Sequence, residues 1–178
     1  SSQHPYAVKI LNGLMKEADI PNPEGKLFVL PDHPRLGPYR EEFKGMLGWL
    51  ERRPKSRKPG RKIYRNADKV TSTAKMNKML YKDHDHQMDL PAYLQARLFD
   101  MWVADWDRHG KNWSWLGYGD KKKMTFYPFA KDRDKALTRM DGLFRVLDFP
   151  MISRDMYRFR KTYRGLKSLN FKSRNMDR

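Results

Sequence analysis

The chain has 178 residues, no cysteine, and a formal net charge of +17 from 38 Lys and Arg against 21 Asp and Glu. The absence of cysteine excludes disulfides, thiolate metal sites and cysteine nucleophiles, and no apolar run reaches the roughly 20 residues that span a bilayer. The length suits one domain with its own core, and the charge favours anionic partners such as nucleotides, phosphorylated glycans, nucleic acid or lipid head groups.

The first third of the chain is predicted to contain two helices and a strand. Apolar residues recur on one face after Pro5, a residue type favoured at the first helical position, and predict a helix over residues 5–18. A short apolar run at 26–30 predicts a strand, and the prolines and glycine that follow predict a stiff loop over 31–38. Apolar residues at i, i+3, i+4 and i+7 then predict a second helix over 39–51.

Three polar stretches are predicted to be exposed. Residues 52–65 carry eight Lys and Arg with two prolines and a glycine, which predicts a solvated basic loop; the alternative is a loop that binds anions or a partner. Asp83-His84-Asp85-His86 alternates Asp and His, but alternating residues in a polar loop rarely converge on one ion, so we expect a solvated loop rather than a metal cluster. Lys121 to Lys123 predict a charged hairpin tip.

Two further helices are predicted before the most distinctive polar motif. Ser72 is expected to cap a short helix with apolar residues at 76–80. Asp89 and Pro91 are expected to start another helix that runs to about Ala104. The apolar residues expected on one face of that helix are Leu94, Leu98 and Phe99.

The polar motif that follows has the residue types that phosphoryl transfer requires. Asp107 and Asn112 stand five residues apart, two aromatic-rich runs at 113–118 and 124–127 predict a β-hairpin, and a second acidic stretch begins directly after it at 131–134. In phosphoryl transfer one carboxylate orients the attacking hydroxyl, while a second carboxylate and an amide hold the Mg²⁺ that bridges the nucleotide phosphates. A hairpin between the two loops would bring both to the same end of the site.

Each of these residues also has a purely structural interpretation. Asp105, Asp107 and Asp120 are of a type common in caps and turns, and Arg108 and Arg133 would serve as ordinary ion-pair partners. Packing in the core is the expected role of the four tryptophans around the loop, with stacking on a base or sugar as the alternative. These tryptophans are Trp102, Trp106, Trp113 and Trp115.

The motif supports a resemblance to a known group of enzymes. Asp107-Arg108-His109 with Asn112 resembles the Asp-Arg-His…Asn catalytic loop of atypical kinases, namely phosphoinositide kinases, HipA-type kinases and spore-coat CotH kinases, and Asp132-Arg133-Asp134 is similar to the metal-binding acidic loop of the CotH-like group. The whole chain resembles a kinase-like segment of large Bacteroidota envelope proteins. Those proteins often join it to a calcineurin-like phosphoesterase domain, an outer-membrane surface-antigen barrel, or both. The matching stretches are 2–7, 29–37, 67–70, 97–115, 127–134 and 169–171.

The resemblance implies a catalytic set in the first loop. Asp107 would be the catalytic base, and His109 would support the loop. Arg108 would pair with a neighbouring carboxylate or with a phosphate of the substrate.

The resemblance also implies a cofactor set and a fold. Asn112 and Asp132 would bind the Mg²⁺ of Mg²⁺-ATP, with Asp134 as a second acidic contact. The expected fold is α+β and mostly helical, like the C-lobe of a protein kinase, with a small β-hairpin that holds the site.

A single domain over residues 1–178 is expected, as a piece of a longer protein. Neither a Gly-rich loop nor a strand with a phosphate-binding lysine precedes the first helix, so the nucleotide-clamping lobe would lie before Ser1.

Three functions stay open: phosphoryl transfer from Mg²⁺-ATP to a hydroxyl of a protein or envelope glycan, a non-catalytic scaffold that docks to a barrel or phosphoesterase neighbour, and polyanion binding through the basic loops. Nucleic acid is the less expected polyanion, because no nucleic-acid module appears. Only the resemblance, and no targeting signal, points to the periplasm or outer membrane.

Overall fold

The computed structural model describes residues 6–55, 63–138, 159, 161–162 and 173. Within these residues the chain forms four α-helices and two β-sheets, so the predicted α+β class is confirmed. The helices are α1 (Ala7–Glu17), α2 (Arg40–Phe43), α3 (Thr73–Lys82) and α4 (Leu90–Trp102), with 3-10 helices η1 (Pro34–Tyr39), η2 (Tyr64–Asn66) and η3 (Gly110–Asn112). The strands are β1 (Glu24–Val29), β2 (Leu47–Arg52), β3 (Lys69–Ser72), β4 (Gln87–Met88), β5 (Trp113–Gly119) and β6 (Met124–Ala130). None of the helices in the described part is long and apolar enough to cross a membrane.

The larger sheet organises the molecule, and its strand order is β3-β5-β6-β4. Strands β5 and β6 pair antiparallel from Trp113↔Ala130 onward, β3 pairs antiparallel with β5, and the short β4 runs parallel to β6. At the exposed tip of the β5–β6 hairpin, the Asp120 carboxylate accepts hydrogen bonds from the backbone N–H groups of Lys122 and Lys123 at 2.7 and 2.8 Å. The predicted hairpin and its charged tip are therefore confirmed, and Asp120 is a turn residue.

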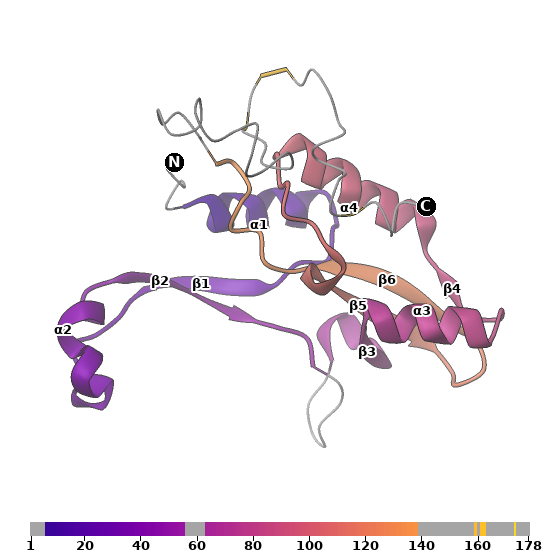
Figure 1. Ribbon diagram of the computed structural model, residues 1–178, viewed down its shortest axis with the longest axis horizontal. Helices are drawn as coiled ribbons and strands as arrows, with labels where there is room; N and C mark the ends of the chain where they lie inside the picture. Colours follow the sequence, from indigo (N-terminus) through magenta and orange to yellow (C-terminus); the bar gives the residue numbers. More distant parts are fainter. Residues whose placement is uncertain (1–5, 56–62, 139–158, 160, 163–172, 174–178) are drawn as a thin grey trace, which may run out of the picture.

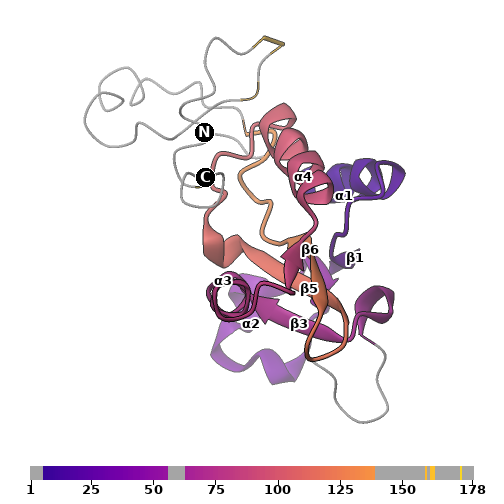
Figure 2. The ribbon, with the colours of Figure 1, turned by 90° about the vertical axis from the view of Figure 1, so that its right-hand side faces the viewer.

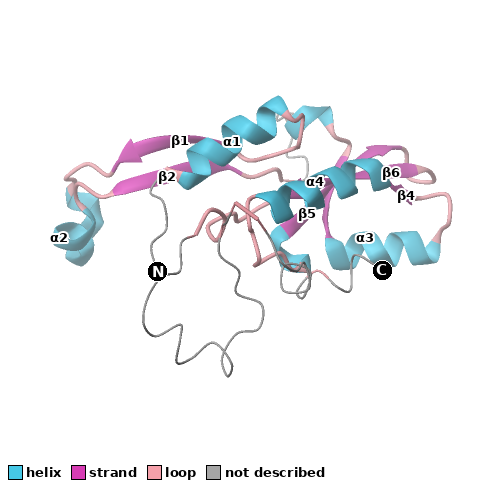
Figure 3. Cartoon of the chain, turned by 90° about the horizontal axis from the view of Figure 1, so that it is seen from above, coloured by secondary structure: helices cyan, strands magenta, loops and turns pink. Residues whose placement is uncertain are grey.

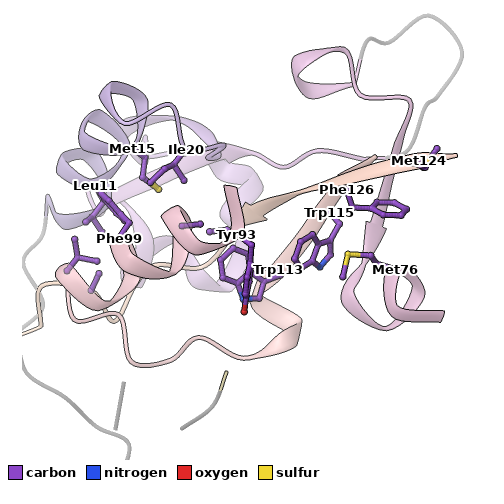
Figure 4. Packing of buried hydrophobic residues seen from close by; sticks show 14 residues of the cluster. Leu11, Met15, Ile20, Met76, Tyr93, Phe99, Trp113, Trp115, Met124 and Phe126 are labelled. Atoms are coloured by element: carbon purple, nitrogen blue, oxygen red, sulfur yellow. The ribbon is translucent and has the colours of Figure 1, made fainter. Parts of the chain in front are cut away.

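The two faces of the β5–β6 hairpin belong to different apolar clusters. On one face Trp113 and Trp115 pack with residues of α1, α3 and α4 (Figure 4), and Figure 2 shows α1 and α4 side by side beyond the sheet. On the other face Leu116 and Phe129 pack with residues of the 63–67 segment. Fully burying one large apolar side chain contributes about 1.5–3 kcal/mol. The hairpin is thus held on both faces and gives a rigid base to the loops at its end.

Strands β1 and β2, with α2 at their tip, form an arm over residues 24–52 that projects from the body (Figures 1 and 3). The strands pair antiparallel along their whole length, and the Trp49 ring covers Gly25, where a Cβ would lie 2.3 Å from the ring. A side chain at residue 25 would therefore displace the Trp49 ring from this position. Large apolar side chains of the arm are exposed: Val29, Tyr39, Met46, Leu47 and Leu50.

The prediction of a single helix over 39–51 is wrong. Helix α2 ends at Phe43, and β2 begins at Leu47. Gly45 has a φ of 75°, a left-handed conformation that ends helices, and its N–H donates to the Leu30 carbonyl at 2.8 Å. The apolar spacing is compatible with a helix, but pairing with β1 supplies the backbone hydrogen bonds of this segment instead.

Several local predictions agree with the structure. The helix predicted over 5–18 is α1, and the strand predicted over 26–30 overlaps β1. The Ser72 side chain caps α3 by accepting a hydrogen bond from the Lys75 N–H at 3.4 Å. Residues 56–62 of the predicted basic loop lie outside the described residues. So do residues 2–5 and 169–171 of the stretches that carry the resemblance.

Helix α4 leads directly into the first loop of the polar motif. It begins as predicted, with Asp89 as its N-cap, and ends at Trp102, close to the expected end. The three apolar residues predicted to share one face differ in burial, because Leu94 and Leu98 are 58% and 56% exposed whereas Phe99 is buried. The residues that α4 buries are Tyr93, Ala96, Arg97, Phe99 and Asp100.

Replacing Asp89 by Ala is expected to lower the free energy of unfolding by about 0.5–2 kcal/mol, the usual cost of losing an N-cap. The carboxylate accepts a hydrogen bond from the Ala92 N–H at 2.8 Å, and its hydrogen bond with Tyr127 raises the pKa of that phenol. Urea denaturation would measure the change. The exposed Asp85 offers a control, since Asp85→Ala should change stability by less than about 0.5 kcal/mol. An equal effect of both substitutions would contradict the capping role.

Candidate functional site

The β5–β6 hairpin brings the two loops of the polar motif together. The 105–112 loop ends where β5 begins, and the 131–134 loop starts where β6 ends. Because Trp113 pairs with Ala130, both loops lie at the same end of the hairpin. The Lys131 N–H donates to the Asn112 carbonyl at 2.9 Å and joins the loops directly. This arrangement is the one that the sequence predicted.

A buried ionic cluster lies where the two loops meet α4. Asp100 of α4 pairs with Arg97 at 2.9 Å, with Arg108 at 3.3 Å and with Arg133. Asp105 pairs with Arg108 and lies 3.6 Å from Arg133. None of the five side chains is exposed, so three guanidinium groups and two carboxylates are enclosed in the protein. We refer to these five residues as the ionic cluster.

The ionic cluster carries more positive than negative groups among the described residues. The Nε and Nη2 atoms of Arg133 and one oxygen of Asp105 have no hydrogen-bond partner there. Burial lowers the pKa of Arg133 and raises that of Asp105. Burial also acts to lower the pKa of Arg108, but Asp105 and Asp100 outweigh it and the pKa is raised. Aromatic rings flank the guanidinium groups, with Arg108 5.4 Å from the Trp113 ring centroid.

Arg108 connects the ionic cluster to both loops. Its Nη1 donates to the Asn112 carbonyl at 3.2 Å and to the Lys131 carbonyl at 2.5 Å, while its other donors face Asp105 and Asp100. Of the two partners that the sequence allowed for Arg108, a carboxylate or a phosphate, the structure shows carboxylates. Arg108 therefore positions the loops relative to each other from beneath the surface.

The first loop is shaped by hydrogen bonds among its own residues. The Asn112 amide Nδ2 donates to the Asp107 carbonyl at 2.7 Å, and the Asn112 N–H donates to the His109 carbonyl at 2.9 Å. His109 Nδ1 accepts from the Lys111 N–H at 3.2 Å, which makes His109 the cap of η3. Thr73 of α3 donates its hydroxyl to the Gly110 carbonyl at 2.7 Å. Asp107 and His109 are half-buried.

The second loop places carboxylates at the surface. Asp132 is exposed and has a φ of 56°, a left-handed conformation that costs energy outside glycine. Asp134 is also exposed and forms an ion pair with Lys135. The hydrogen bond that the Lys135 ammonium donates to the Asp134 carboxylate raises the pKa of Lys135, and the charges of Asp107 and Asp132 act in the same direction. Of the three acidic residues in the predicted site, Asp134 is the one that pairs directly with this lysine.

The two loops carry few side chains that could bind a metal ion. Among the described residues, no group of three or more His, Cys, Asp or Glu could hold an ion by itself. The Asn112 amide nitrogen donates to the Asp107 carbonyl, so Oδ1 is the atom of this amide that could bind an ion, and the exposed Asp132 belongs to the adjoining loop. One amide oxygen and one carboxylate fit Mg²⁺, which is often held by one or two protein ligands together with phosphate oxygens.

The Asp83–His86 segment is only partly a solvated loop. Asp83 accepts a hydrogen bond from the Asp85 N–H at 3.1 Å, and both His84 and Asp85 are exposed. His86, in contrast, is buried, with its ring 6.2 Å from that of Phe126. The prediction of a solvated loop is therefore wrong for His86, which packs on the sheet.

The structure shows which arginine, aspartate and tryptophan side chains of the motif have the purely structural roles considered for them. Arg108 and Arg133 are ion-pair partners, and Asp105 is part of the ionic cluster rather than a cap or turn residue. Trp106, Trp113 and Trp115 are buried, as expected, whereas Trp102 is 56% exposed.

Sequence reasoning missed Arg97 and Asp100, which complete the ionic cluster. Their signal was a pair of opposite charges at i and i+3 inside an otherwise apolar helix. That pattern is common on exposed helix faces, and only the position of α4 against the two loops shows that the pair is buried.

Comparison with protein-family models, with curated proteins and with solved structures finds no match to this chain. The functional argument therefore depends on the geometry of the two loops and on the residues that they carry.

Proposed function

We propose that this chain is the catalytic half of an atypical kinase-like domain, which transfers a phosphoryl group from Mg²⁺-ATP to a hydroxyl of a protein or envelope glycan. One observation carries the proposal. The loop with Asp107 and Asn112 and the loop with Asp132 adjoin at one end of a hairpin, joined by the Lys131–Asn112 backbone bond and by Arg108. Kinase-like enzymes need a base, an amide and a metal-binding carboxylate together in this way.

The proposed roles follow from the positions of the residues. When bound, Mg²⁺-ATP supplies the phosphoryl group and the ion that neutralises its charge. Asn112 Oδ1 and the Asp132 carboxylate would hold the metal ion, with Asp134 nearby. Asp107 would orient the acceptor hydroxyl and take its proton as the hydroxyl oxygen bonds to the γ-phosphorus and the bridging oxygen leaves with ADP. Arg108 and His109 would hold the loop in shape without touching the reacting atoms.

The finer fold assignment and the cellular context belong to the same proposal. The order of catalytic loop, hairpin and acidic loop supports a protein-kinase-like C-lobe, with the nucleotide-clamping lobe elsewhere in a longer protein. The resemblance adds a place in the periplasm or outer membrane and, as partners, a barrel or phosphoesterase domain of the same protein.

Calorimetric titration of ATP into the full-length protein, with and without Mg²⁺, tests the proposal. Asp132→Ala is expected to weaken Mg²⁺-dependent ATP binding by at least about 10–100-fold, the range seen even for groups that only support metal ligands. The exposed Asp85→Ala serves as the control and should bind like the unsubstituted protein. ATP binding that is the same with and without Mg²⁺ would contradict the proposal.

A non-catalytic scaffold is the second candidate, and the arm is the observation that favours it. Val29 and Leu50 are 60% and 68% exposed there, although large apolar side chains are usually covered. Under this alternative the kinase-like frame docks to a neighbouring domain. Magnesium-dependent ATP turnover that Asp107→Asn abolishes would exclude it.

A further inference from the structure

Every charged side chain of helix α3 is positive. Lys75, Lys78 and Lys82 are spaced i, i+3 and i+7, so they share one side of the helix, and all three are exposed. Lys69 of β3 extends this row, since its ammonium group contacts the Met79 sulfur of α3 at 3.4 Å. We call these four lysines the α3 basic face.

The helix gains little stability from these lysines. Ser72 caps α3, so Lys75 holds the third helical position, where Glu or Gln is favoured and where a positive charge meets the positive end of the helix dipole. Lys78 and Lys82 are like charges at i and i+4, a spacing that destabilises a helix, and only Lys82 lies at the end of the dipole that favours a cation. Among the described residues, none of the four lysines forms an ion pair with a carboxylate. The needs of the fold therefore do not explain the α3 basic face.

An exposed aromatic ring lies among the lysines. Tyr81 is 88% exposed, more than any other large apolar side chain in the described part of the chain. Lys78 precedes it by one helical turn, and Lys82 follows it directly. The other large apolar side chains of α3 are turned to the core, where Met76 is buried and Met79 and Leu80 are partly buried. The surface thus combines cations with a single ring, which fits a ligand that alternates anionic groups and rings better than it fits a lipid bilayer.

The α3 basic face begins beside the first loop of the candidate site. The Thr73 hydroxyl, in the first turn of α3, donates to the Gly110 carbonyl at 2.7 Å and accepts from Trp115 Nε1 at 3.1 Å. These bonds fix the start of the helix against the loop that carries Asp107. From Lys75 to Lys82 the helix rises roughly 10 Å, so a linear ligand that lies along α3 would lead toward that loop.

We propose that the α3 basic face and Tyr81 bind an anionic polysaccharide, whose acidic groups meet the lysines while a sugar ring packs on the tyrosine. This inference rests on the proposed function and narrows its acceptor to a glycan hydroxyl. Single-stranded nucleic acid is the other linear polyanion with rings. Proteins that bind it place several aromatic rings under successive bases and add arginines that stack on them, whereas α3 carries one aromatic ring and no arginine.

Calorimetric titration of a galacturonic acid oligosaccharide into the full-length protein, at about 0.15 M salt, tests the inference. Replacing Lys75, Lys78 and Lys82 together by Gln is expected to weaken binding about 100-fold, at roughly fivefold for each lost charged contact. Tyr81→Ala should weaken it about fivefold, and Tyr81→Phe should restore the affinity, because the ring and not the hydroxyl makes the contact. Binding of the unsubstituted protein should also weaken as salt is raised.

A second triple substitution controls for the net charge of +17. Replacing Lys9, Lys16 and Lys26 by Gln removes the same charge from α1 and β1, which lie apart from α3 (Figures 1 and 3), and should change the affinity less than about twofold. Removal of like charges from α3 should not lower its stability, so an unchanged thermal unfolding temperature would show that weak binding does not come from misfolding.

The outcomes separate this inference from the proposed function. Equal affinity of the two triple variants for the oligosaccharide, or no binding by the unsubstituted protein, would overturn the glycan surface. So would an oligo-dT strand that loses affinity in the α3 triple variant while the oligosaccharide does not, because the surface would then bind nucleic acid. In each case the Asp132→Ala test of Mg²⁺-dependent ATP binding still decides the proposed function. Oligosaccharide binding that needs the α3 lysines, together with ATP binding that ignores Mg²⁺, would keep the glycan surface and refute the phosphotransferase.

Discussion

Replacing Asp100 by Asn is expected to lower the free energy of unfolding by about 3–5 kcal/mol, the cost of removing one partner from a buried ion pair. Asp100 is fully buried and pairs with Arg97, Arg108 and Arg133. The substitution keeps the size of the side chain but leaves three buried guanidinium groups with Asp105 as their remaining carboxylate in the ionic cluster. Urea denaturation followed by tryptophan fluorescence would measure the loss.

Removing a positively charged side chain from the same cluster, instead of a negatively charged one, provides the control. Arg133→Met removes the surplus positive charge together with two buried nitrogen atoms that lack a hydrogen-bond partner in the described part of the chain. We therefore expect Arg133→Met to destabilise the protein less than Asp100→Asn, although it also loses a contact with the Phe99 ring. Equal losses, or a smaller loss for Asp100→Asn, would show that packing rather than charge balance governs the cluster.

Replacing Asp107 by Asn is expected to slow phosphoryl transfer by about 10²–10⁴-fold, the usual contribution of a general base. The hydrogen bond from Asn112 goes to the Asp107 backbone carbonyl, which the substitution retains. The affinity for Mg²⁺-ATP should therefore change little. Single-turnover transfer from labelled ATP, beside calorimetric ATP binding, would measure both quantities.

Asp120→Asn is the matched control for this experiment. Asp120 is exposed at the far tip of the hairpin, and its carboxylate serves only the turn in the described structure. Its amide replacement should transfer phosphate at the unsubstituted rate. An Asp107→Asn protein with an unchanged rate would remove Asp107 from the catalytic role, and an equal loss of ATP affinity would assign it to binding instead.

The main effect of the ionic cluster on the candidate site is to fix the relative position of the two loops, more than to stabilise the fold. A buried ion pair is weak evidence for stability, because desolvation offsets much of the attraction. Arg108, however, donates to the backbone of both loops while its charge is balanced from α4 and from the first loop. A hydrophobic replacement would fill the space but could not hold two carbonyl groups at once. The cluster thus sets the distance between the loop of Asp107 and the loop of Asp132.

Local sequence patterns determined the parts of the fold whose causes are local. Caps at Ser72 and Asp89, the period of α1 and the alternation of β5 and β6 depend on residues close in sequence, and each was predictable. The hairpin also determined that the two polar loops would adjoin, because antiparallel pairing places the residues before one strand next to those after the other.

Tertiary structure decided what depends on partners distant in sequence. Residues 47–52 have apolar spacing that fits a helix, yet pairing with β1 makes them a strand. On α4, Leu94 and Leu98 are exposed while Arg97 and Asp100 are buried, since the loops that neutralise the charged pair pack on that face. Burial of a charge is favourable only where opposite charges and hydrogen bonds converge on it. That convergence involves residues 97 to 133, and a sequence pattern of a few residues does not contain it.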